Sequence, residues 1–408
     1  MQSLYEFYKI GNGPSSSHTM GPKRAVERFI NTYKDIDKLK VILYGSLALT
    51  GKGHLTDYII KETSYPIETE IEFDLDKECT VHPNTMKIIG YKNENIVDDW
   101  TVYSVGGGTI KIDGEEDTDV PDIYELNKFE DIKIYCEENN LKLHEYVYNV
   151  EGYEITTYLK EVWNAMKEAV ETGLNKTGMI PGRLRLSRTA SDIYNTVVDN
   201  EDESLKQTRL LSSYAIAVSE ENASGGKIVT APTCGASGVL PAVLYYYNHD
   251  KNVPENVIIE ALAVAGLIGN LVKTNASISG AECGCQAEIG TACSMAAAAS
   301  AYIIGLDIER IENAAEVAME HHLGLTCDPI YGYVQIPCIE RNAVAAIRAI
   351  DSSKLSMLMR KHKSISFDVV VDTMYETGKD LHSHYRETAE GGLAKKYCRN
   401  KYYNKDMA

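Results

Sequence analysis

Three of the nine cysteines stand beside residues that end helices, where thiols can be directed toward a common point. Cys285 lies between a glycine and a glutamine, Cys327 precedes an Asp-Pro pair, and Cys338 follows a proline. The chain has no Cys-x-x-Cys pair and no compact ferredoxin run. Two interpretations stay open: these thiols form a three-thiolate metal site, or they only pack as small buried residues. Spacing alone favours packing.

A zinc site is a further interpretation of the same region. His321 and His322 with Cys327 and Cys338 would supply two nitrogen and two sulfur ligands. Adjacent residues on a helix point about 100° apart, so neighbouring histidines are poorly placed to bind one ion. The zinc interpretation therefore ranks low.

Near the start of the chain, the stretch GPSSSHTMGP (13–22) places three hydroxyls and a histidine between two Gly/Pro pairs. Apolar residues recur at helical spacing after it, with a glycine, Gly21, at the cap position and a proline in the first turn. The serines therefore fall at a helix N-terminus, where unpaired N–H groups and the helix dipole favour an anion. We expect polar contacts to a substrate from Ser15, Ser16, Ser17, His18 and Thr19.

A second stretch, GSLALTGKGH (45–54), follows a strand-like run and ends in a histidine. It fails as a phosphate loop, because five rather than four residues separate its first two glycines and Gly53 replaces the Ser/Thr that holds Mg²⁺. What remains is a Gly-Lys-Gly-His turn that would present His54 at the edge of a cleft. The stretch VHPNTM (81–86) offers Asn84, either as a substrate ligand or in an ordinary Asx turn.

The elements that carry these residues predict an α+β fold. Short strand-like runs and helices alternate through residues 1–150, which read as a mixed α/β domain. Residues 155–408 read as a mostly α-helical domain, in which 257–272 and 291–306 are apolar nearly all round, as in helices inside a bundle. Polar, glycine-rich turns at 221–244 and 274–285 either line a pocket or only connect helices.

The composition excludes some classes of function. The 408 residues carry a formal net charge of −18, which argues against partners such as nucleic acid or an anionic membrane. The first residues lack the basic and apolar segments of a signal peptide, and the most apolar stretch is interrupted by Glu260 and Asn270. Nine cysteines without a secretion signal indicate the reducing cytoplasm.

Together these motifs resemble the bacterial iron–sulfur L-serine dehydratases, the L-serine ammonia-lyases. The matching pieces run through nearly the whole chain in the family's order, from GPSSSHTMGPKRA, LYGSLALTGKGHLTD and VHPNTM to NASGGKIVTAPTCGASGVLPAVL, NASISGAECGCQAEIGTACSMAAA, HHLGLTCDPIYGYVQIPCIERNA and YRETAEGGLA. The chain looks like the single-chain form, in which the β and α domains are fused.

The resemblance implies a [4Fe-4S] cluster held by Cys285, Cys327 and Cys338. In some family members a C-terminal cysteine plugs the fourth iron, and Cys398 is the matching candidate, although ten residues follow it. The resemblance also implies L-serine as the substrate. No motif argues for pyridoxal phosphate, and a homodimer is the expected assembly.

Serine is a difficult substrate because hydroxide leaves poorly and the Cα–H is weakly acidic. Elimination therefore needs a Lewis acid at the β-hydroxyl and a base at Cα. His54 is our candidate base and His18 the second choice, so the site should form where the two domains meet. The alternatives are a related lyase acting on threonine or cysteine, and an amino-acid-binding module without catalysis.

Overall fold

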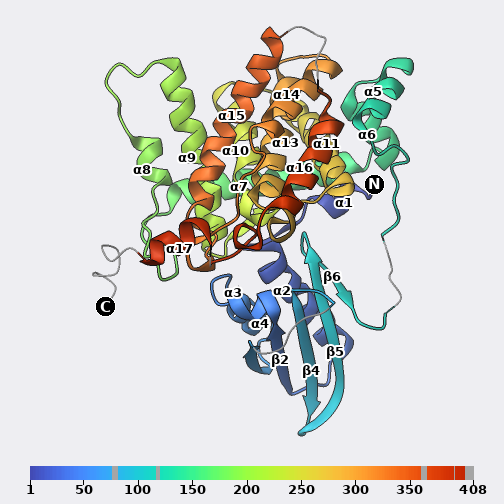
Figure 1. Ribbon diagram of the computed structural model, residues 1–408, viewed down its shortest axis with the longest axis vertical. Helices are drawn as coiled ribbons and strands as arrows, with labels where there is room; N and C mark the ends of the chain where they lie inside the picture. Colours follow the sequence, from blue (N-terminus) through green and yellow to red (C-terminus); the bar gives the residue numbers. More distant parts are fainter. Residues whose placement is uncertain (76–80, 116–119, 360–364, 390, 400–408) are drawn as a thin grey trace.

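The computed structural model describes residues 1–75, 81–115, 120–359, 365–389 and 391–399. A helical body forms one end of the molecule and a small sheet with its covering helices forms the other (Figure 1). The predicted α+β fold class is confirmed. Cys79 lies outside the described residues.

The sheet has five strands in the order β3-β2-β4-β5-β6. β2 and β3 pair in parallel, and every other neighbouring pair is antiparallel. Glutamates alternate with half-buried residues along β3, as its sequence pattern predicted. The strand bounds are β2 Lys38–Tyr44, β3 Glu68–Asp74, β4 Thr85–Lys92, β5 Asn95–Gly106 and β6 Thr109–Ile112.

Helices α2 (Gly21–Thr32) and α4 (Thr56–Ser64) cover the sheet with their apolar sides. Phe29 of α2 packs in one core with Ile88 of β4 and Ile60 of α4, and its ring meets Trp100 edge-on. A short helix, α3 (Gly45–Thr50), follows β2 where the sequence predicted only a strand and a turn. This small core holds the first histidine-bearing segments against the helical body.

The helical body is built around α13 (Thr291–Ile303), which is buried from Thr291 to Ala301. Its alanines favour the helix and let α11 (Glu255–Asn275), α14 (Ile308–Glu320) and α15 (Cys338–Leu358) pack closely around it. The remaining helices of this body are α5 Phe129–Glu138, α6 Leu143–Glu151, α7 Ile155–Asn175, α8 Ala190–Asn195, α9 Glu203–Ala223, α10 Val239–Tyr245, α12 Gly280–Cys283, α16 Phe367–Asp380 and α17 Gly392–Arg399.

Among the described residues, α11 alone is long and apolar enough to cross a membrane, but 78% of its most apolar window is buried inside the protein. Its neighbours include the first helix, α1 (Leu4–Phe7), and Tyr8 donates a hydrogen bond to the Leu262 carbonyl at 3.0 Å. These contacts cover the apolar surface of α11, as is usual for a helix in the core of a protein.

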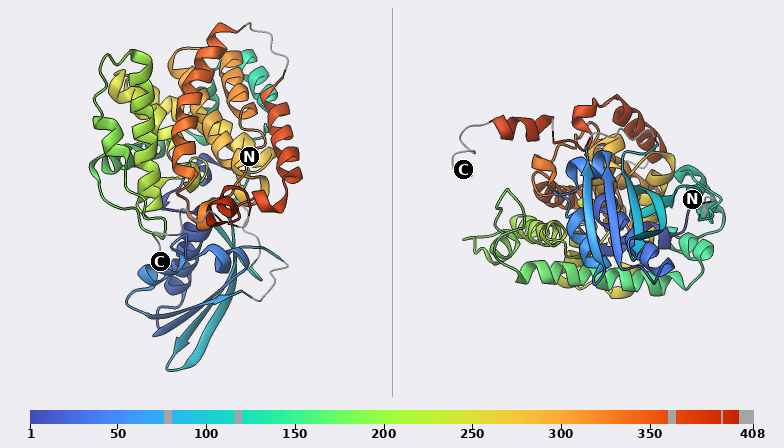
Figure 2. Two further views of the ribbon diagram at one scale, coloured as in Figure 1. Left: turned by 60° about the vertical axis from the view of Figure 1, so that its left-hand side comes forward. Right: turned by 90° about the horizontal axis from the view of Figure 1, so that it is seen from below.

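The start of the chain connects the two ends of the molecule. α1 packs in the helical body, and β1 (Ile10–Asn12) pairs antiparallel with β7 (Lys227–Val229). The chain then turns into α2, which lies on the sheet, and the view from below shows the sheet laid across one end of the helical body (Figure 2). Residues 13–20 therefore lie at the junction of sheet and helices.

Candidate active site

A cavity of about 410 Å³ lies at this junction. Ser15, Ser16, Ser17 and His54 line it from the N-terminal segments. The side chains that the helical body contributes include Thr233, Cys285, Glu288, Cys327, Cys338 and Glu387. The two glycine-rich turns also contribute, through 233–235 and 276–282, so residues far apart in sequence share one space.

The serine segment forms a single helical turn of its own. Ser16–Met20 is a π-helical turn capped by Ser15, whose Oγ accepts a hydrogen bond from the His18 backbone N–H at 3.1 Å. Gly21 is thus the first residue of α2 and not its cap, which corrects the predicted position. The reason is that the cap is Ser15, six residues earlier, and the π-helical turn that it caps continues into α2 without a break.

Contacts from both ends of the molecule hold this segment. Asn222 of α9 donates from Nδ2 to the Pro14 carbonyl at 3.1 Å, and the Gly13 N–H donates to the Gly226 carbonyl at 3.1 Å. From the sheet, Ser104 Oγ donates to the Ser17 carbonyl at 2.7 Å. A Cβ on Gly13 would lie 2.1 Å from Asn222 Oδ1, so only glycine allows this approach.

His18 and His54 lie side by side, with ring centroids 4.4 Å apart. Both are buried, but only His54 lines the cavity, and its Nδ1 has no hydrogen-bond partner among the described residues. His18 Nε2 is 3.0 Å from Ser46 Oγ. Burial lowers the pKa of His18 to about 4, and burial together with His18 lowers the pKa of His54 well below its usual range.

Thr19 and Asn84 lie near the cavity without lining it. Thr19 is buried and donates from Oγ1 to the His54 carbonyl at 2.8 Å. Asn84 donates from Nδ2 to the Ser104 carbonyl at 3.4 Å, while its buried Oδ1 has no partner among the described residues. Both residues therefore touch the elements that carry the lining side chains.

The three predicted cysteines lie at element ends around the cavity. Cys285 follows Gly284, which has a φ of +74° and ends α12, and Cys338 is the first residue of α15. Cys327 lies in a loop held by the C-terminal segment, because its N–H donates to the Tyr385 carbonyl at 2.7 Å. All three are buried. The three cysteines that stand beside helix-ending residues thus line the same cavity.

The surroundings of these thiols shift the pKa of two of them strongly. A hydrogen bond with Cys285 and burial raise the pKa of the Cys327 thiol well above its usual range, and burial does the same to the pKa of Cys338. Arg341, one turn into α15, supplies a nearby positive charge, and the cysteines in turn raise its pKa against the effect of burial. A metal that displaces the thiol protons would compensate these buried groups.

Two carboxylates that the sequence motifs did not single out also lie in the cavity wall. Glu288 and Glu387 both line it. Burial, followed by the charge of Glu288, raises the pKa of Glu387 to about 8, and burial raises the pKa of Glu288. The position of Glu288, three residues after Cys285 in CQAE, was the available signal, because it is one helical turn away.

The other predicted metal ligands do not join this group. His321 lines a separate hollow on the surface between α14 and α15, and its Nδ1 is 2.8 Å from the Val317 carbonyl. His322 Nδ1 is 2.7 Å from the Ala318 carbonyl. This arrangement does not support the zinc interpretation. Cys398 belongs to α17, but its side chain lies outside what the structure describes.

The class of protein follows from comparison of this sequence with family models. Residues 90–394 match the serine dehydratase alpha chain, and residues 3–62 match the serine dehydratase beta chain. Both parts occur here in one polypeptide. The chain therefore belongs to the serine dehydratase family and is an enzyme.

Relatives of known name match along nearly their whole length. L-serine dehydratase 2 of Escherichia coli (strain K12) is 39% identical, over 97% of this chain and 99% of the relative. L-serine dehydratase of Haemophilus influenzae is 40% identical, over 98% and 100% of the two chains, and one from Helicobacter pylori is 38% identical, over 96% and 98%. These similarities confirm the family expected from the motifs.

Proposed function

We propose that this enzyme deaminates L-serine to pyruvate and ammonia by eliminating the β-hydroxyl. The observation that carries the proposal is the shared cavity, which is lined both by His54, a buried histidine, and by three buried thiols. The names of the similar enzymes support serine as the substrate. Loss of the Cα proton and of hydroxide gives aminoacrylate and water, and the imine tautomer then hydrolyses to pyruvate and ammonia.

Cys285, Cys327 and Cys338 would hold a [4Fe-4S] cluster. The donor set fits the group, because three buried thiols line one cavity and the Arg341 guanidinium lies close to them. When bound, a cluster held by three thiolates supplies a Lewis-acidic iron for the substrate's hydroxyl and carboxylate oxygens. Pyridoxal phosphate is not needed for such an elimination.

His54 is the proposed base that takes the Cα proton. Its side chain lines the cavity, and its Nδ1 has no hydrogen-bond partner among the described residues. Burial lowers its pKa well below the usual range, so the imidazole is neutral at pH 7 and able to accept a proton. His18 remains the second choice. Ser46 already lies within hydrogen-bond distance of His18. His18 is therefore better suited to position the His54 ring than to act as the base.

Ser15, Ser16 and Ser17 would bind the polar groups of serine from the capped turn, since all three line the cavity. Thr19 would act through the His54 carbonyl that it contacts. Asn84 does not line the cavity, so it would act indirectly, through its hydrogen bond to the Ser104 carbonyl.

At the level of the whole chain, we propose that residues 1–150 contribute the base and the substrate contacts and that residues 155–408 bind the cluster. A cytoplasmic homodimer without nucleic-acid or membrane partners, sensitive to oxygen because of its cluster, is the corresponding proposal for the cell.

Comparison of substrates without air tests the function. The reconstituted enzyme should form pyruvate from L-serine with no added pyridoxal phosphate, and threonine and cysteine should be turned over far more slowly. Faster turnover of threonine or cysteine would contradict serine as the substrate. Binding of serine without turnover by enzyme that contains its cluster would favour the binding-module alternative.

A further inference from the structure

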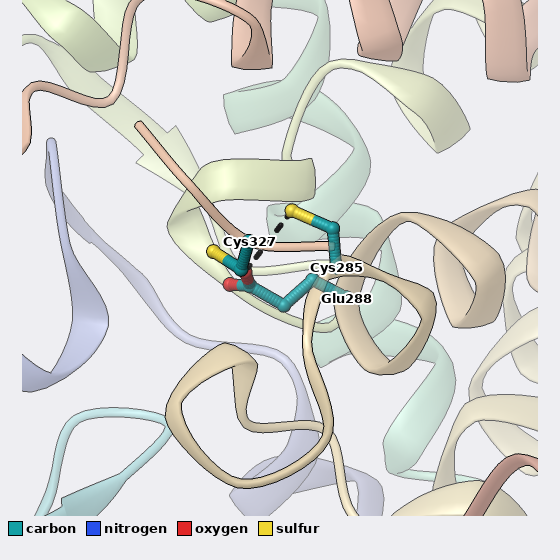
Figure 3. A group of neighbouring side chains, drawn as sticks. All are labelled: Cys285, Glu288 and Cys327. Atoms are coloured by element: carbon teal, nitrogen blue, oxygen red, sulfur yellow. Dashed lines mark hydrogen bonds between the residues drawn. The ribbon is translucent and has the colours of Figure 1, made fainter. Parts of the chain in front are cut away.

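Two of the three cysteine sulfurs lie close together, next to a carboxylate. Glu288 Oε2 is 4.0 Å from Cys285 Sγ and 3.9 Å from Cys327 Sγ, and these three atoms lie within 4.8 Å of one another (Figure 3). Thiolates at this place would gather negative charge among buried groups, which is costly unless positive charge lies beside them. A cation supplied by the protein would therefore stabilise the thiolate form.

Arg341 supplies positive charge to these thiols from outside the cavity. It lies three residues after Cys338 in α15, about one helical turn, and its side chain is 16% exposed. It is not among the described residues that line the cavity. Burial alone would lower the pKa of Arg341, but the charges of Cys285 and Cys338 raise it. A hydrogen bond with Cys285 and the charge of Cys327 act in the same direction, so the guanidinium interacts with all three cysteines.

The same guanidinium connects the two segments that carry Cys327 and Cys338. Its Nη1 donates to the Thr326 carbonyl at 2.6 Å, and its Nη2 lies 3.6 Å from Asp328 Oδ1. Thr326 and Asp328 stand on either side of Cys327 in a loop, whereas Arg341 and Cys338 belong to α15. A guanidinium presents several N–H donors in fixed directions, so one side chain can make both contacts at once. Arg341 thus ties the Cys327 loop to the start of α15.

Further contacts hold Asp328 beside the guanidinium. Its side chain is only 3% exposed. Thr326 Oγ1 donates to Asp328 Oδ1 at 3.0 Å, and the Leu393 N–H, at the start of α17, donates to Asp328 Oδ2 at 2.6 Å. Gly392 has a φ of +45°, and a Cβ on it would lie 1.8 Å from Oδ2, so this approach requires glycine. The carboxylate that meets Arg341 is therefore fixed at both oxygens.

From these contacts we propose that Arg341 is the positioning residue of the cluster site, which holds the Cys327 loop against the start of α15 and balances the negative charge of the thiolates. The proposal rests on the proposed function, because it concerns a bound cluster. Hydrogen bonds and positive charge near the sulfurs of an iron–sulfur cluster raise its reduction potential, and groups that support the ligands favour retention of the metal. Arg341 acts through the cysteines and not on the substrate.

The test compares wild type, Arg341→Gln and Arg341→Lys after anaerobic reconstitution with iron and sulfide. Glutamine removes the charge and shortens the side chain, whereas lysine keeps the charge but cannot reproduce the planar arrangement of donors. Arg348→Gln is the matched control, because Arg348 lies two helical turns further along α15, is exposed and lines the separate surface hollow. The rate of iron release to a chelator without air and the reduction potential of the cluster are measured in each protein.

We expect Arg341→Gln to release iron about 10- to 100-fold faster than wild type, the usual effect of removing a group that supports a metal site. Arg341→Lys should release iron at an intermediate rate, and Arg348→Gln at the wild-type rate. The reduction potential should fall in Arg341→Gln and stay near the wild-type value in Arg341→Lys, because only glutamine removes the charge. A residue with a purely structural role would not separate the potentials of the two variants.

Two results would overturn the proposal and leave the proposed function intact. One is iron release at the wild-type rate in Arg341→Gln, and the other is a wild-type potential in that variant. Wild type that binds no cluster would overturn both the proposal and the proposed function.

Hydrogen exchange covers the case in which Arg341→Gln does not fold or does not load a cluster. In the Arg341→Lys holoenzyme, the backbone amides of residues 324–329 should exchange about tenfold faster than in wild type, because the loop loses a charged hydrogen bond to α15. The amides of residues 291–301 in α13 should exchange as in wild type. Equal exchange of residues 324–329 in Arg341→Lys, wild type and Arg348→Lys would overturn the proposal.

Discussion

The His18 and His54 rings lie 4.4 Å apart between centroids, and of the two residues only His54 lines the cavity. In the proposed function His54 contacts the substrate, while His18, whose Nε2 is 3.0 Å from Ser46 Oγ, supports the His54 ring.

Replacing His54 with glutamine should lower kcat by about 10²–10⁴-fold, the usual contribution of a positioned base. The iron content should stay at the wild-type level, because the proposed cluster ligands are the three cysteines and not His54. His321→Gln is the control, since His321 lines a different hollow. Steady-state pyruvate formation without air is the measurement, and unchanged kcat in His54→Gln would remove His54 as the base.

Ser17→Ala should weaken serine binding with a smaller effect on kcat. Loss of one hydrogen bond to a polar ligand costs about 0.5–1.5 kcal/mol, which corresponds to a rise in KM of roughly 2- to 10-fold. Ser187→Ala, at an exposed site away from the cavity, should leave KM unchanged. The same KM and kcat in Ser17→Ala as in wild type would count against a substrate contact here.

Asn222→Ala should disturb the active site from outside it. The change leaves the Pro14 carbonyl without its buried partner, at a cost of about 1–3 kcal/mol, and loosens the serine turn. Chemical denaturation should show the lower stability, and KM for serine should rise in the folded enzyme. Asn195→Ala provides an exposed asparagine control. Wild-type KM in Asn222→Ala would mean that the turn holds its shape without this contact.

His18 should make the folded state less stable in acid. Burial lowers its pKa from 6.5 to about 4, so between these values the unfolded chain binds the proton and the folded chain does not. Stability should therefore be constant above about pH 7 and fall as the pH decreases toward 4, with a loss of about 2 kcal/mol by about pH 5. Urea unfolding of wild type and His18→Gln at both pH values checks this, and equal losses in the two proteins would contradict it.

The motifs predicted the class of fold and the chemically distinctive part of the cavity lining, because they combine unusual residues with helix-ending neighbours. Cys285, Cys327 and Cys338 stood out for that reason, and His54 stood out because it ends a Gly-Lys-Gly turn. The long apolar helices were equally clear, since α11 and α13 are buried on nearly every side.

Other features depend on contacts that no local pattern carries. β1 and β7 are three residues each and lie more than two hundred residues apart in the sequence. Neither segment therefore carries a local pattern that predicts the pairing. Asn84 immediately precedes β4 and donates a hydrogen bond to the Ser104 carbonyl of β5, and it does not line the cavity. The spacing of Glu288 from Cys285 shows that the two lie one helical turn apart, but its contacts with Thr233 and Cys327 depend on the tertiary fold.

The most direct test of the central claim is the iron and acid-labile sulfide content measured beside serine-dependent pyruvate formation, without air. Wild type should bind about four irons and four sulfides per chain and be active. Cys285→Ser, Cys327→Ser and Cys338→Ser should each lose both cluster and activity. Cys293→Ala, in the core of α13, should keep both. Serine turnover at the full rate by wild-type protein that contains neither iron nor sulfide would contradict the account.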